Sequence, residues 1–250
     1  MRTTLVRLAL VAAAILTPAA GFAAQAAAPP SSGAPDSLRA TGELGFVATS
    51  GNTHLTTVNA AERVELRRSG FALTQGLSIV YGRSEGETTT SQWQATLRGD
   101  YAVAPSVAIY TAVAWDRNRF AGLARRFEEG AGLAVALAQG PRHELNLESG
   151  VSLVQERATT TADDNFSAGR AAARYVYHLG ETANLRQALE LLANLETTRD
   201  VRLNSETALV APLSRRLALK VSYVIRFDNR PEPGFATTDQ LFTTALQLTL

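Results

Sequence analysis

Apolar and polar side chains alternate with a period of two from Thr41 to Leu250, whereas the helical period of 3.6 hardly occurs. In residues 143–157, for example, Leu147 faces one way and Glu148 the other. The same template predicts about twelve two-faced strands. They cover roughly residues 41–49, 54–67, 71–83, 92–103, 107–118, 126–137, 143–156, 166–179, 183–196, 201–211, 215–227 and 238–250. The chain is therefore expected to be all-β.

Strand length and loop length point to a membrane barrel. Most predicted strands have about 11 to 14 residues, whereas strands of soluble proteins usually have about 5–6 and a tilted membrane strand needs about 9–11. Connections after even-numbered strands are tight, as at 68–70. Most connections after odd-numbered strands are longer and polar, as at 84–91 and 229–237. This asymmetry predicts a single antiparallel up-and-down transmembrane β-barrel, residues 41–250, with both termini in the periplasm. A soluble periplasmic barrel that binds a small ligand remains the alternative.

The first residues resemble an export signal. Arg2 and Arg7 precede the apolar run 8–16, and small residues allow cleavage after Ala23, Ala26 or Ala28. The apolar run is about half as long as a spanning helix requires. We expect residues 1–28 to be a signal peptide, residues 29–40 a flexible lead, and the location to be the cell outer membrane.

The face opposite the leucines is rich in charges of both signs. On the barrel interpretation this face lines the lumen, where neighbouring strands can form ion pairs. The residues of this charge ladder are Glu148, Glu156, Arg170, Arg174, Arg186, Glu190, Arg202, Glu206, Lys220 and Arg226. The sequence leaves open whether they fill a closed lumen or line a narrow aqueous pore. Because the signs balance, no strong anion or cation preference is predicted.

The composition of the chain argues against several other classes of function. The net charge of +1 gives no basic field for nucleic acid, and no cysteine is present for disulfide or thiolate chemistry. Neither a cofactor nor a metal site is expected. Small residues at Gly130-Ala131-Gly132 are taken to admit neighbouring side chains rather than to cradle a nucleotide. His143 and His178 have opposite parity, so a lipid-modifying hydrolase would have to be centred on His54. No catalytic motif supports that alternative, and we expect no enzyme.

Several short runs resemble one family. They are Thr49-Ser50-Gly51-Asn52-Thr53, Asp116-Arg117-Asn118-Arg119-Phe120-Ala121-Gly122, Gly130-Ala131-Gly132-Leu133, Leu147-Glu148-Ser149-Gly150-Val151, Gly234-Phe235 and Thr237-Thr238-Asp239. On these runs, residues 41–250 are similar to the salt-induced outer-membrane proteins, a YdiY-like family whose domain has no known function.

The resemblance implies an outer-membrane β-barrel of Gram-negative bacteria, linked in some members to salt or acid stress. It implies no catalytic residues. Asp116, Arg117 and Arg119 would sit at the external mouth, where they would brace a loop or contact lipopolysaccharide phosphates. Expected partners are outer-membrane lipid, lipopolysaccharide and, during biogenesis, the barrel-assembly machinery and periplasmic chaperones. The expected function is an envelope structure or a narrow passive pore.

Overall fold

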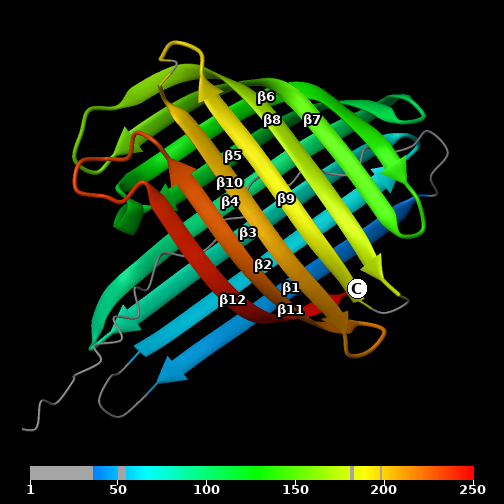
Figure 1. The fold of residues 1–250 in the computed structure, drawn as a ribbon, viewed down its shortest axis with the longest axis horizontal. Coiled ribbons are helices and arrows are strands. Elements are labelled where there is room, and N and C mark those ends of the chain that lie inside the picture. Colours follow the sequence, from blue (N-terminus) through cyan, green and yellow to red (C-terminus); the bar gives the residue numbers. More distant parts are fainter. Residues whose placement is uncertain (1–35, 50–54, 181–182, 198) are drawn as a thin grey trace, which may run out of the picture.

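Twelve β-strands follow one another around a closed antiparallel barrel in the computed structural model, which describes residues 36–49, 55–180, 183–197 and 199–250 (Figure 1). The strands are β1 (Ser37–Thr49), β2 (Leu55–Arg68), β3 (Phe71–Ser84), β4 (Glu87–Ala104), β5 (Val107–Asn118), β6 (Leu123–Gln139), β7 (His143–Ala158), β8 (Asp164–Leu179), β9 (Ala183–Asn194), β10 (Val201–Pro212), β11 (Leu217–Asp228) and β12 (Thr238–Thr249). A 3₁₀ turn, η1 (Arg119–Ala121), joins β5 to β6. The predicted all-β fold and strand number are confirmed.

Pairing of the first strand with the last closes the barrel. Thr41 lies opposite Thr249 and Leu44 opposite Leu246. At the end of this seam the backbone of Ala40 exchanges two hydrogen bonds with that of Leu250, at N···O distances of 3.2 and 2.9 Å. Closure removes the free strand edges, which a lipid environment would leave without hydrogen-bond partners.

The structure corrects two predicted boundaries. Strand β1 begins at Ser37, so residues 37–40 are not part of a flexible lead; β2 is long enough to offer each of them a backbone partner, as in the Arg39–Glu65 pair. The predicted loop 84–91 is also wrong, since β3 and β4 continue to a two-residue turn at Glu85-Gly86. Both turn residues have positive φ, +49° and +86°, as a tight hairpin turn requires. The predicted signal peptide, residues 1–28, lies outside the described residues.

The two faces of the sheet have inverted polarity compared with a water-soluble protein. Along β7 the outward Val151 is 60% exposed, whereas the inward Glu148 is 4% exposed. Along most of the other strands, a band of leucine and aromatic side chains lies outside and polar groups lie inside. An apolar exterior around a polar interior is the arrangement that lipid demands of a barrel. Among the described residues, no helix has the length and apolar character needed to cross a membrane.

Adjacent residues of β10 test this inside-out arrangement. Leu203 points outward, and Asn204 lines the lumen. We expect a spin label at residue 203 to be relaxed mainly by molecular oxygen, which concentrates in acyl chains, and a label at residue 204 mainly by a water-soluble nickel chelate. Electron paramagnetic resonance of the two labelled proteins in lipid vesicles measures both accessibilities. Equal chelate accessibility at the two positions would contradict the membrane barrel.

Candidate functional site

A buried ion-pair cluster lies in the middle of the lumen. The Glu148 carboxylate contacts two guanidinium groups, with Oε1 2.8 Å from Arg98 and Oε2 2.7 Å from Arg170. Arg98 also contacts Asp100 at 2.6 Å, and Arg170 contacts Glu190 at 2.7 Å. The Glu148 side chain is 0% exposed. We refer to Arg98, Asp100, Tyr110, Glu148, Arg170 and Glu190 as the central cluster.

Two glycines give the central cluster its space. Gly132 on β6 and Gly150 on β7 lie opposite each other, and the Tyr110 side chain of β5 lies over them. A Cβ at Gly150 would lie 2.6 Å from the Tyr110 hydroxyl oxygen, and one at Gly132 would lie 2.9 Å from Cε1 of the ring. The Arg98 guanidinium lies over the Tyr110 ring in a cation–π contact, with its Cζ atom 4.2 Å from the ring centroid. Gly132 therefore has the predicted role of admitting a neighbouring side chain.

A second group of ion pairs lies on the opposite wall. Lys220 of β11 contacts Glu43 of β1 at 3.0 Å and Glu206 of β10 at 3.1 Å. The Gln247 amide donates a hydrogen bond of 3.2 Å to the same Glu43 carboxylate. We call Lys220, Glu43 and Glu206 the lysine triad. Because one ammonium group bridges two carboxylates, the triad holds β1, β10 and β11 together inside the lumen.

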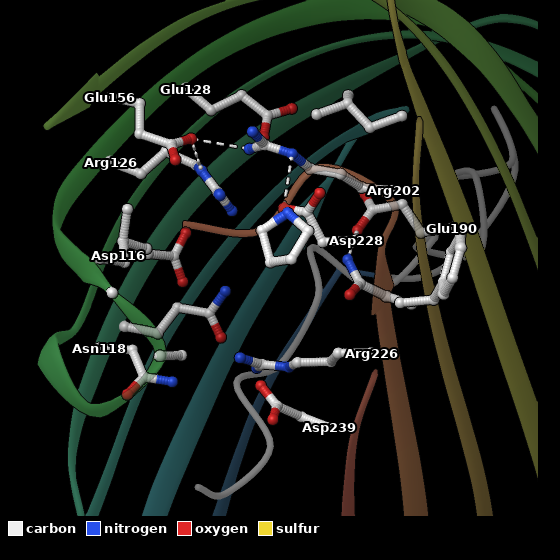
Figure 2. Close-up of a pocket in the computed structure, with 18 of the residues that line it drawn as sticks. Asp116, Asn118, Arg126, Glu128, Glu156, Glu190, Arg202, Arg226, Asp228 and Asp239 are labelled. Carbon is white, nitrogen blue, oxygen red and sulfur yellow. Dashed lines mark hydrogen bonds and ion pairs between the residues drawn. The ribbon is translucent and has the colours of Figure 1, made fainter. Parts of the chain in front are cut away.

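The loop-side half of the lumen contains an open charged network. The Glu156 carboxylate contacts Arg126 at 2.9 Å and Arg202 at 2.7 Å, and Arg202 reaches Asp228 at 3.3 Å. Figure 2 shows that Arg226 approaches from the other wall and points toward Asp239. Both signs therefore alternate around this part of the lumen, and the charges are arranged to neutralise one another.

Among the described residues, three cavities follow one another along the lumen. The outer cavity, at the loop side, has a volume of about 1010 Å³. A middle cavity of about 40 Å³ shares Leu241 with the outer one, and an inner cavity of about 170 Å³, at the rim of the chain termini, shares the lysine triad with the middle one. The middle cavity has room for little more than a water molecule. The lysine triad thus lies between the smallest of these cavities and the inner one.

Residues 229–237, which connect β11 to β12, cross toward loops on the far side of the outer mouth. We call this segment the strap. The Glu232 carboxylate accepts hydrogen bonds of 2.7 Å from the hydroxyls of Thr160 and Thr161, in the β7–β8 loop. A Cβ at Gly122, beside η1, would lie 2.8 Å from that of Glu232. The strap and η1 lie at the same end of the barrel in Figure 1, so the strap covers part of the outer cavity that it lines.

The residues predicted at the external mouth do not form one group. Asp116 and Arg117 are neighbours on β5 and face opposite sides of the sheet, with Asp116 lining the outer cavity. Arg119 lies in η1 and is exposed. In the described part of the chain, no ion pair joins these three side chains.

An exposed ion pair lies at the β7–β8 loop. There, a hydrogen bond from Arg157 lowers the pKa of the exposed Asp163 carboxyl.

The histidines of the described residues form no shared site. His143 lies 2.7 Å from the Tyr175 hydroxyl on the outer face, and His178 pairs with Glu144 at 2.9 Å. His54, on which the hydrolase alternative depends, lies outside the described residues. No group of three or more carboxylate or histidine side chains in the described ranges is placed to hold a metal ion.

Sequence reasoning missed part of the central cluster. The predicted charge ladder includes neither Arg98 nor Asp100, and Tyr110 is not among the predicted site residues. Inward parity on β4 and β5 is a sequence signal that places all three in the lumen, although parity alone does not give their contact with Glu148. The ladder residues Arg174 and Arg186 lie elsewhere, in the inner cavity.

Comparisons with known proteins agree with this architecture. The chain is 24% identical over 203 residues to the Escherichia coli (strain K12) protein titled "Uncharacterized protein YdiY", covering 81% of this chain and 79% of that protein. The COG4313 outer membrane channel from Pseudomonas putida F1 is similar in structure, with a TM-score of 0.50 at 12% identity over 92% of this chain and 98% of that one. The translocator domain of autotransporter NalP from Neisseria meningitidis has a TM-score of 0.45 at 11% identity, over 85% and 87% of the two chains.

The similarity to the Pseudomonas putida channel shows the fold alone, which is that of an outer-membrane β-barrel. A family model matches residues 42–249, nearly the whole barrel. The family expected from the short sequence runs is thereby confirmed, and the chain belongs to the family described as "Protein of unknown function, DUF481".

Proposed function

We propose that the protein is a narrow passive pore of the outer membrane for small hydrophilic solutes, and not an enzyme. The observation that carries the proposal is the succession of three cavities that share lining residues from one rim of the barrel to the other. A barrel filled only for stability would have no reason to keep a cavity of about 1010 Å³ lined with paired charges.

The lysine triad is the constriction of this pore. Its side chains separate the middle and inner cavities, and Lys220 is 7% exposed. We also propose a link to salt or osmotic stress. Contact of the apolar band with outer-membrane lipid and lipopolysaccharide, and assembly by the barrel-assembly machinery, are part of the same proposal.

Substitution of Lys220 tests the pore and its constriction together. Lys220→Ala removes a long side chain and leaves Glu43 and Glu206 without their cation, so we expect a ~2-fold or greater rise in unit conductance and a shift toward cations. Lys220→Gln keeps most of the side-chain length and is expected to shift selectivity with little change in conductance. Single-channel recording in planar bilayers, with a salt gradient for the reversal potential, measures both quantities.

Arg157→Ala is the matched control, since it removes a cation whose ion pair with Asp163 is exposed at the loop rim. It is expected to leave conductance and reversal potential unchanged. Absence of unit steps in the wild-type protein would eliminate the pore and leave a purely structural barrel. Unit steps that Lys220→Ala does not alter would place the constriction elsewhere.

A further inference from the structure

The inner and outer cavities differ in charge. The inner cavity is lined by six cationic side chains, Arg39, Arg63, Arg67, Arg174, Arg186 and Lys220, against four acidic ones, Glu43, Glu62, Glu65 and Glu206. The outer cavity has six arginines against seven acidic side chains. Charges that balance over the whole lumen are therefore segregated along its axis, with the cationic excess at the rim of the chain termini.

The acidic residues of the inner cavity are already engaged. Glu65 pairs with Arg67, and Glu43 and Glu206 belong to the lysine triad. Glu62 accepts a hydrogen bond of 2.5 Å from Gln75, a residue of the outward face of β3. None of these four carboxylates forms an ion pair with the remaining arginines of the cavity.

Three half-buried arginines consequently lack an anionic partner. Within the described residues, Arg63, Arg174 and Arg186 form no ion pair; Arg186 donates a hydrogen bond of 2.6 Å to the Asn184 side chain. They come from different parts of the wall, since Arg63 lies on β2 and the other two on β8 and β9, and all three line the same cavity.

Like charges that converge in a partly enclosed space repel one another and lose hydration, unless an anion joins them. A guanidinium group offers a planar fork of N–H donors that matches two oxygens of a carboxylate or phosphate. The inner cavity, at about 170 Å³, has room for one such group with its remaining water.

We propose that the inner cavity is a binding site for a small solute oxyanion with two or more negative charges, held between Arg63, Arg174 and Arg186. Where the protein acts as the pore proposed above, this site also makes the pore favour anions at the side of the chain termini. The sequence predicts no such preference, because it counts charges over the whole lumen and does not resolve their position along the axis.

Binding is tested independently of conduction. Isothermal titration calorimetry of the folded mature protein in detergent, with inorganic pyrophosphate as the probe, is expected to show binding to the wild type. The variant carrying Arg63→Gln, Arg174→Gln and Arg186→Gln should bind about 100-fold more weakly, since hydrogen bonds to three charged groups are lost. Arg230→Gln removes an arginine of the outer cavity and is the matched control, with unchanged affinity expected.

A heat-modifiable gel shift verifies that the variants fold, and single Arg174→Gln protein replaces the triple variant if the latter does not. Equal affinity in the wild type and in the folded variant, or no binding to the wild type, would overturn the site.

A bilayer measurement separates the two proposals. Pyrophosphate added at the side of the chain termini should reduce the chloride current of the wild type and not that of the triple variant, whereas addition at the loop side should have less effect. A protein that binds pyrophosphate in calorimetry and shows no unit steps would refute the pore and retain the site. A protein that conducts chloride and does not bind pyrophosphate in calorimetry would refute the site and retain the pore.

Discussion

Replacement of Glu148 by alanine is expected to lower the free energy of unfolding by about 3–5 kcal/mol, the range for breaking a buried ion pair from one side. The Glu148 carboxylate contacts both Arg98 and Arg170, and the side chains of these arginines are 6% and 4% exposed. Its loss leaves the two guanidinium groups close together in a poorly hydrated part of the lumen. Denaturant titration in lipid vesicles, followed by the fluorescence of Trp93 and Trp115, measures the change.

Glu129→Ala is the matched control for this prediction. Glu129 is also a glutamate in mid-strand, one strand away on β6, but it is exposed on the outward face. Removing a charge from the lipid-facing side should leave stability unchanged or raise it. Similar losses in the two variants would show that the central cluster contributes nothing specific, and a loss below about 1 kcal/mol for Glu148→Ala would show that water or other groups solvate the arginines.

The direction of these side chains follows from the sequence, whereas their partners do not. Alternation with a period of two is enough to place Glu148 and Arg170 in the lumen, because moving one side chain to the other face of a strand moves its neighbours as well. The contact of Arg98 with Glu148 joins β4 to β7 across two intervening strands. That contact depends on the space that the absence of a Cβ at Gly132 and Gly150 leaves for the Tyr110 side chain. This space is a property of the closed barrel and not of any one segment.

The loop rim was the least predictable part of the fold. Glu85-Gly86 adopts the turn that Asn-Gly or Asp-Gly usually signals, so the hairpin of β3 and β4 was mistaken for a polar loop. The sequence predicts one motif from Asp116 to Arg119, but β5 continues through Arg117 and its alternation separates the side chains. Irregular connections carry no periodic signal, and their contacts depend on loops far away in the sequence.

Glu232→Ala is expected to open the outer mouth. The strap is joined to the β7–β8 loop by two hydrogen bonds to the Glu232 carboxylate, from residues 72 and 71 positions away. Losing two hydrogen bonds of about 1 kcal/mol each shifts the balance between the docked and the undocked strap by roughly 30-fold. Because the strap lines the outer cavity, undocking widens the entrance. We expect longer dwell times in high-conductance levels and an increased distance between spin labels at residues 162 and 233.

Asp163→Ala provides the comparison, because Asp163 lies in the same β7–β8 loop and its carboxylate pairs with Arg157, not with the strap. It removes an acidic side chain and an ion pair at the rim while the threonine contacts of Glu232 stay in place. If the strap limits entry, only Glu232→Ala should change the dwell times, and Glu232→Gln, whose amide oxygen still accepts a hydrogen bond, should restore part of the docked population. Identical traces for all three variants would mean that the constriction at the lysine triad alone determines passage, and that the strap is a fixed part of the rim.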